Sequence, residues 1–286
     1  MEFIAAHKNI IPPQKKMIET AEMWADTVVR KTKNILPYLA KFCILSTFFE
    51  DSLRMWFQWP EQRDYFNYVW KCGFFLSNVL VLINLIGQLI PSFLVTINKK
   101  STESAYALLA LVITQGVIYK VIFNVQYLMK SAAILGGLVL LLASYREEIK
   151  STMFASLPSL ENAYSSRKSI LQLGGRLLLV LMFLTLFISE KEWSSVFTWL
   201  RLFVGLGLIV TILIGYKTTL AGITAALWLM ANNVFHNSFW RYEAHTHHHD
   251  YYKFDFFQTM SVIGGLLLLV SIGPGGASID ERKKRW

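Results

Sequence analysis

Two adjacent carboxylates and an arginine interrupt an otherwise apolar stretch near the start of the chain. Glu50, Asp51 and Arg54 lie in FFEDSLRMWFQW, between aromatic residues. A charge at bilayer depth costs about 2.5–3.5 kcal/mol on insertion scales, so charges in an apolar helix need partners, water or a ligand. Glu50 and Arg54 are four residues apart and can pair on one helix face, which would leave Asp51 free to meet a ligand cation. An internal ion pair without a ligand is the other interpretation.

Aromatic and polar side chains at nearby helix ends could complete such a site. Trp56 and Trp59 follow the charges and suit an interfacial aromatic belt. Asp255 and Gln258 begin a later apolar segment. Further hydrogen-bonding side chains are expected at the same depth: Lys120, Asn124, Gln126, Asn232, Asn233, His236, Asn237 and Thr259. Together they predict a polar cavity on one side of a membrane, unless each satisfies a neighbouring helix instead.

A dense histidine string, HTHHHD, runs from His245 to Asp250. Imidazoles at this density can bind zinc or copper. A membrane metal enzyme would need several separated histidine clusters, and only His236 stands apart from the string. We therefore expect a solvated loop that protonates near pH 6.5, and no metal. The sequence contains no nucleotide loop, serine elbow or zinc-protease helix, so we expect neither a cofactor nor an enzyme.

The composition is typical of a protein that crosses a membrane repeatedly. Hydrophobic residues make up 54% of the chain and charged residues 16%, against about 25% charged in a soluble domain. The mean hydropathy is +0.40. The net charge of +9 could suggest nucleic-acid binding, but the basic residues lie at segment ends and not along one face. We expect an all-α polytopic membrane protein that binds no nucleic acid.

Eight segments approach the roughly 20 apolar residues that a membrane-spanning helix needs. They are residues 36–58, 68–97, 104–123, 126–145, 170–189, 194–215, 218–240 and 255–273. The second is long enough to tilt or to bend at Pro91. With both termini in the cytosol, seventeen Lys and Arg side chains outside the spans, including those of both terminal segments, face the cytosol. Four face the other side: Arg63, Lys191, Arg241 and Lys253. This bias follows the positive-inside rule.

The segment before the first span also has a helical pattern. In residues 1–34, Met17, Ala21, Trp24 and Val28 recur at helical spacing. The pattern predicts an amphipathic helix on the cytosolic membrane surface. A soluble cap over the helix bundle is an equally good interpretation.

An internal duplication divides the membrane part of the chain. ILGGLVLLLAS (134–144) matches VIGGLLLLVSI (262–272) with both glycine pairs aligned. We therefore expect two repeated four-helix bundles, residues 35–145 and 170–273. A cytosolic loop (146–169) would separate them and a cytosolic tail (274–286) would follow. The glycines, Gly136, Gly137, Gly264 and Gly265, should allow close helix contacts.

The last four residues, KKRW, place two lysines near the end of the chain. Lys283 and Lys284 resemble the dilysine retrieval signal of the early secretory pathway, an address that the COPI coat reads in the cytosol. A basic tail is also what the positive-inside rule places on that side.

Longer strings resemble a known family. RMWFQWPEQRDY (54–65), DFFQTMSVIGGLLLLVSIGPGGASID (255–280) and the KKRW end are similar to the surfeit locus protein 4 family, and the likeness begins at about residue 20. The resemblance also implies distant kinship with DoxX-type four-helix membrane proteins, which agrees with a duplicated bundle. The residues before about 20 and the HTHHH stretch depart from the family pattern.

The resemblance implies a cargo receptor that cycles between the endoplasmic reticulum (ER) and the Golgi. Such receptors bind soluble secretory proteins in the lumen through short hydrophobic motifs near the cargo N-terminus. They leave in COPII vesicles and return through COPI, and the family is linked to lipoprotein secretion. Only Lys283 and Lys284 can be assigned a family role. Membrane lipids are further expected partners, and the formation of a homo-oligomer is left open.

A site hypothesis combines the residues with this implied function. Glu50 and Asp51 would hold the ammonium of a cargo N-terminus while neighbouring aromatic side chains bury its first apolar residues. The candidate cargo-binding residues are Glu50, Asp51, Arg54, Trp56 and Trp59, with Asp255 and Gln258 as second-choice contacts. Two alternatives stay open: a lipid transporter or scramblase with a polar path between the bundles, and a membrane redox enzyme.

Overall fold

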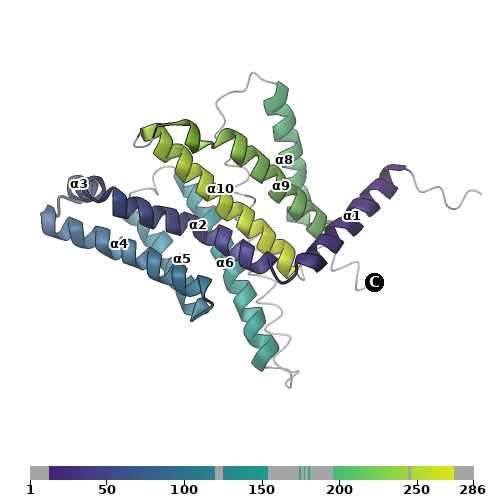
Figure 1. Cartoon of the computed structure of the whole chain (residues 1–286), viewed down its shortest axis with the longest axis horizontal. Coiled ribbons are helices and arrows are strands. Elements are labelled where there is room, and N and C mark those ends of the chain that lie inside the picture. Colours follow the sequence, from purple (N-terminus) through teal and green to yellow (C-terminus); the bar gives the residue numbers. More distant parts are fainter. Residues whose placement is uncertain are drawn as a thin grey trace, which may run out of the picture.

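The described part of the chain is built from helices (Figure 1). The computed structural model describes residues 13–119, 125–153, 174, 177, 180, 196–243 and 246–273. The helices in chain order are α1 (Pro13–Thr32), α2 (Leu36–Phe57), α3 (Trp59–Trp70), α4 (Gly73–Thr96), α5 (Ser101–Ile118), α6 (Val125–Met153), α8 (Val196–Ile214), α9 (Thr218–His236), the short 3-10 helix η3 (Phe239–Arg241) and α10 (His247–Ile272).

Four segments among the described residues are long and apolar enough to cross a membrane. They are Gly73–Thr96, Ser101–Ile118, Thr218–Arg241 and His248–Ile272. Several such segments in a chain whose described part is built from helices make this a polytopic membrane protein. The larger number of eight spans and their division into two bundles stay predictions, and the span predicted at 170–189 lies largely outside the described residues.

The predicted boundaries differ from the helices at the end of the 104–123 segment, where α5 already ends at Ile118, and more consequentially at three other places. The single span predicted at 68–97 is wrong at its start, because α3 ends at Trp70 and α4 begins at Gly73. Lys71 between them has φ 49° and Gly73 has φ 80°, and left-handed residues of this kind terminate helices. At the second place, α6 continues to Met153, so the first part of the predicted loop 146–169 is helical.

The third difference is the start of α10. This helix begins at His247, well before residue 255, so the predicted solvated loop is wrong from His247 onward. His245 lies outside the described residues. Thr246 precedes the helix with an extended backbone, and Asp250 lies in the first turn, where a negative charge is favourable beside the helix dipole.

α2 is buried along most of its length between other helices (Figure 1). It packs on α4, and it lies antiparallel beside α10. The Thr47 hydroxyl donates to the Phe257 carbonyl at 2.9 Å, and the Ser261 hydroxyl donates to the Ile44 carbonyl at 2.8 Å. α2 carries four charged side chains, and two of them, Lys41 and Glu50, are buried in the protein at 9% and 3% exposure, away from lipid. The α2–α10 pair also joins the two predicted halves of the chain.

The two antiparallel helices come close together at Gly264. A Cβ atom there would lie 2.7 Å from the Ala40 carbonyl oxygen and 2.7 Å from the Ile44 nitrogen. At Gly137 of α6 a Cβ would meet Ile44 at an ordinary 3.7 Å. The prediction of a close glycine contact is therefore confirmed at Gly264, where the missing side chain lets two backbones touch.

The substitution Gly264→Ala should lower the free energy of unfolding by about 1–3 kcal/mol, because the added methyl group pushes α2 and α10 apart. Gly137→Ala is the matched control. Its Cβ has room, and alanine is the better helix former by about 1 kcal/mol. Thermal unfolding of both variants in detergent measures the difference. Equal losses in the two variants would contradict a special role for the α2–α10 contact.

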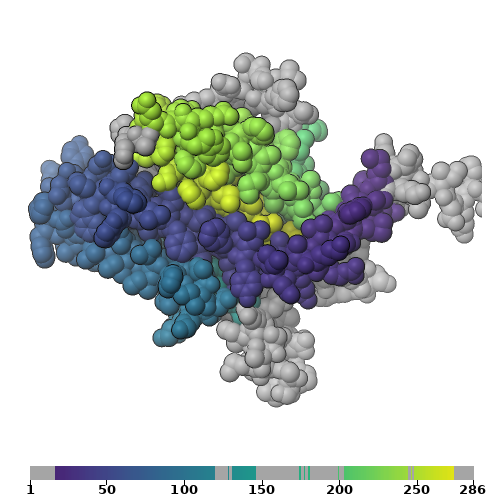
Figure 2. All heavy atoms as spheres, in the orientation of Figure 1, coloured from purple at the N-terminus to yellow at the C-terminus, as the bar shows by residue number. Residues whose placement is uncertain are grey.

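α1 lies at the edge of the bundle and packs on α9 (Figure 2). Ala25 of α1 is 7% exposed. Glu22 forms an ion pair with Lys217, the residue just before α9. The hydrogen bond that Lys217 donates to Glu22 raises the pKa of this lysine above its ordinary value, so the lysine is charged throughout the physiological range.

Candidate functional site

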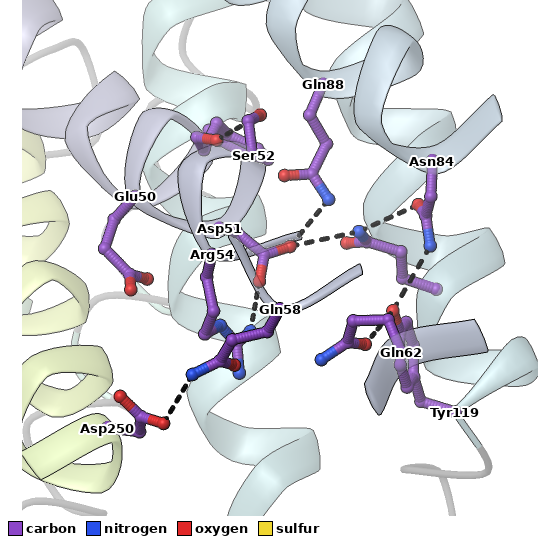
Figure 3. Close-up of polar contacts among 12 residues, drawn as sticks. Glu50, Asp51, Ser52, Arg54, Gln58, Gln62, Asn84, Gln88, Tyr119 and Asp250 are labelled. Carbon is purple, nitrogen blue, oxygen red and sulfur yellow. Dashed lines mark hydrogen bonds and ion pairs between the residues drawn. The ribbon is translucent and has the colours of Figure 1, made fainter. Parts of the chain in front are cut away.

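The two adjacent carboxylates of α2 point to different sides of the helix (Figure 3). Successive residues of an α-helix project about 100° apart, so neighbours in sequence meet different neighbours in space. Glu50 faces Lys253 of α10, and Asp51 faces α4 and α5. The structure therefore separates the two groups that the sequence analysis placed in one ammonium site.

Asp51 is held by three donors. Arg54 forms an ion pair with its Oδ1 atom. Gln88 of α4 donates to Oδ2 at 2.6 Å, and Gln115 of α5 donates to the same oxygen at 3.5 Å. The interpretation in which Arg54 pairs with Glu50 and leaves Asp51 free is therefore wrong. Asp51 is the carboxylate turned toward the glutamine side chains, and their amide donors stabilise its charge together with Arg54.

A chain of side-chain hydrogen bonds continues from Asp51 (Figure 3). Gln115 donates to the Asn84 oxygen at 3.1 Å, and Asn84 donates to the Tyr119 hydroxyl at 3.4 Å. Tyr119 in turn donates to the Gln62 oxygen at 3.4 Å. The network ties α2, α3, α4 and α5 together at one depth, as expected for polar groups that must satisfy one another inside an apolar bundle.

The amide members of this network were not predicted from the sequence. Asn84 and Gln88 are four residues apart within an apolar segment, so they share one helix face. Both are buried, at 5% and 0% exposure. Polar side chains inside a membrane span are expensive and call for a named partner. The same reasoning that singled out Asp51 could have paired it with this face of α4.

Glu50 is the carboxylate with unused hydrogen-bonding capacity. Its side chain is 1% exposed, and neither carboxylate oxygen has a hydrogen-bond partner among the described residues. Lys253 Nζ lies 3.6 Å from Oε1, and the Lys253 side chain is 29% exposed. A buried charge normally has donors as well as a counter-ion, because burial without them costs several kcal/mol. Glu50 can therefore accept a donor that the chain itself does not supply.

The other candidate residues lie around these carboxylates in different surroundings. Trp56 is 63% exposed, whereas the Trp59 indole donates to Asn78 of α4 at 2.8 Å. Gln258 is 2% exposed, and its side-chain oxygen has no hydrogen-bond partner in the described part of the chain. Asp255 is half-buried, and its backbone carbonyl accepts from Thr259 at 2.8 Å.

The histidine string contributes a contact between the ends of α2 and α10. Gln58 donates to Asp250 Oδ2 at 2.7 Å (Figure 3), and His249 Nδ1 lies 3.4 Å from Asp250 Oδ1. In the described ranges, no group of three His, Cys, Asp or Glu side chains is arranged to hold a metal ion. Asp250 thus helps to fix the position of α10 relative to the end of α2.

The polar side chains at the end of α9 form hydrogen bonds with α10 and with one another. Asn233 donates to the Phe256 carbonyl at 3.0 Å, and Asn237 donates to Asn233 at 2.8 Å. For these two side chains the interpretation as contacts that satisfy the bundle is confirmed. Lys120, Asn124 and the side chain of Gln126 lie outside the described residues, as do the tail lysines Lys283 and Lys284.

Comparisons with known proteins identify relatives along nearly the whole chain. The sequence profile of the SURF4 family matches residues 15–286. The surfeit locus protein 4 homolog of Drosophila melanogaster is 41% identical over 274 residues, which cover 96% of this chain and 99% of the relative. The homolog of Schizosaccharomyces pombe is 33% identical over 264 residues, which cover 91% and 85%.

A relative with a more descriptive name comes from Saccharomyces cerevisiae. The ER-derived vesicles protein ERV29 is 34% identical over 260 residues, which cover 91% of this chain and 80% of the relative. No solved structure matches the chain. The family profile and these full-length relatives agree with the resemblance carried by residues 54–65 and 255–280, and this chain belongs to the SURF4 family.

Proposed function

We propose that the protein is a membrane receptor that binds soluble secretory proteins in the ER lumen and takes them into COPII vesicles. It returns from the Golgi through the COPI coat, which reads Lys283 and Lys284. Family membership over nearly the whole chain supports this, together with a relative named for ER-derived vesicles. Both termini are cytosolic in this proposal, in accord with the basic residues between the spans.

Within this function, Glu50 is the group that accepts the cargo ammonium. This step rests on its two oxygens, which have no hydrogen-bond donor among the described residues. A terminal ammonium offers three N–H donors, and charge-assisted bonds to a carboxylate are about twice as strong as neutral ones. Lys253 is partly exposed and can turn to solvent when another cation replaces it. Asp51 is already occupied by Arg54 and two glutamines, so it positions α2 and does not contact cargo.

Acute depletion followed by quantitative proteomics of secreted proteins tests the proposal. We expect a defined set of soluble proteins, including lipoproteins, to be retained in the ER and to be released again by the wild type. Glu50→Gln keeps the shape and removes the charge, so it should reach the ER membrane at normal abundance and fail to restore secretion. Glu61→Gln is the matched control, because Glu61 is an exposed carboxylate at the start of α3.

The outcomes distinguish a failure of the receptor hypothesis from a failure of the hypothesis that Glu50 binds cargo. Rescue by Glu50→Gln equal to the wild type would remove Glu50 from the binding site and leave receptor function in place. Unchanged secretion after depletion would contradict receptor function itself. If purified protein in cargo-free vesicles then redistributed lipid, the chain would be a lipid transporter or scramblase.

A further inference from the structure

α1 carries an apolar stripe that no described helix covers. Met17 is 73% exposed, Trp24 69% and Val28 48%, and Ala21 between them is also exposed. These residues recur at three- and four-residue spacing, so they lie on one face of the helix. An exposed face of large apolar side chains marks a surface that another apolar phase covers.

A different face of α1 contacts the protein. Ala25 is 7% exposed and Glu22 pairs with Lys217 beside α9. At about 100° per residue, Glu22 lies roughly 140° around the helix from Met17. The stripe is therefore not the face that packs on the bundle, which argues against a simple cap. α1 is held on α9 by one side and presents its apolar side elsewhere.

The charges of α1 are arranged around this stripe. Glu19 and Asp26 are exposed, and helical spacing puts them opposite Met17. Arg30, Lys31 and Lys33 are also exposed, at the end of α1 that leads into α2. Figure 1 shows α1 at the end of the bundle where α2 begins and α10 ends. Basic residues next to a membrane span attract anionic lipid by about 1 kcal/mol each.

We propose that α1 lies on an anionic bilayer surface, with Met17, Trp24 and Val28 among the lipid headgroups and Ala25 and Glu22 against α9. The occupant of the stripe is lipid, because a tryptophan-containing apolar face flanked by lysine and arginine is the composition of interfacial helices. Acidic side chains turned away from the stripe avoid repulsion by the anionic headgroups. Since anionic lipids are enriched in the cytosolic leaflet, this contact would also favour a cytosolic N-terminus.

Site-specific quenching in the full-length protein tests this arrangement. In a Cys43→Ala/Cys72→Ser background, Trp24→Cys and Val28→Cys each carry an environment-sensitive fluorophore, and Asp26→Cys is the control on the opposite face. The protein is reconstituted in phosphatidylcholine vesicles with or without about 30% phosphatidylserine. Headgroup-level spin-labelled lipid should quench positions 24 and 28 at least about twofold more than position 26, most strongly with phosphatidylserine.

Two further measurements decide between lipid and protein as the cover. Replacing Arg30, Lys31 and Lys33 with glutamine should abolish the effect of phosphatidylserine while α1 still packs on α9. Equal quenching at positions 24 and 26 would place the stripe in water and overturn the proposal. Protection of positions 24 and 28 from both lipid-borne and aqueous quenchers would show that protein covers the stripe, which would also overturn it.

Discussion

Replacing Asp51 with alanine should lower the free energy of unfolding by about 3 kcal/mol, because it leaves the Arg54 guanidinium in the bundle without its carboxylate. The Asp51 side chain is 16% exposed and that of Arg54 27%, so water can compensate only in part. Gln88 and Gln115 would lose their acceptor as well. Arg54→Ala should have an effect of similar size, since it leaves Asp51 without its cation.

A double-mutant cycle separates pairing from burial. The variant Asp51→Asn/Arg54→Gln removes both charges, and the asparagine side-chain oxygen can still accept from Gln88. This variant should be more stable than either matched single variant, Asp51→Asn or Arg54→Gln, since a buried charge without its partner is the main penalty. Thermal unfolding in detergent and steady-state abundance in cells both report the result. Additive losses in the double variant would contradict coupling between Asp51 and Arg54.

The ion pair of Asp51 also decides which substitution tests cargo binding. Asp51→Asn alone would remove the ion pair with Arg54, so a loss of secretion in that variant would reflect instability as readily as lost cargo contact. Glu50→Gln is the sharper test of cargo binding, because Lys253 can reach solvent when the charge is removed.

Replacing both Lys283 and Lys284 with serine should move most of the protein from the ER to the Golgi. In the proposed function the COPI coat reads this pair, so its loss should remove retrieval without affecting the membrane spans. Fluorescence microscopy against markers of the two compartments measures the redistribution. Secretion of cargo should also fall, because receptor in the Golgi can no longer return for another round. This fall should follow the change in localisation, since each receptor molecule can still carry cargo out once.

A charge-matched variant distinguishes an address from a basic tail. Lys283→Arg/Lys284→Arg keeps the positive charge that fixes orientation. Arginine differs from lysine in shape and hydrogen-bonding geometry, so a receptor that recognises lysine should not retrieve this variant. Retention of the arginine variant in the ER would contradict lysine-specific retrieval and support a purely electrostatic role. Protease protection of the tail checks that neither variant has inverted its topology.

The sequence by itself determined the class of the protein and much of its helical layout. The span at 218–240 was predictable because the length and hydropathy of a membrane helix are local properties of the chain. The boundaries of the helix predicted at 36–58 were also correct to within one residue. Glu50, Asp51 and Arg54 could also be singled out from local sequence, because charged side chains within an apolar segment are energetically costly. The sequences at 54–65 and 255–280 were sufficient to identify the family. The break between α3 and α4 was not predicted, because it depends on single residues with left-handed backbone at Lys71 and Gly73.

Only the tertiary structure decided which partner each charge has. Glu50 and Asp51 are adjacent in sequence, yet the rotation of α2 about its axis sends one to Lys253 and the other to Gln88 and Gln115. That rotation is set by packing against several helices, including the close approach of α10 at Gly264. Residues so far apart in the chain carry no local signal of their pairing, because contact between helices depends on the whole bundle.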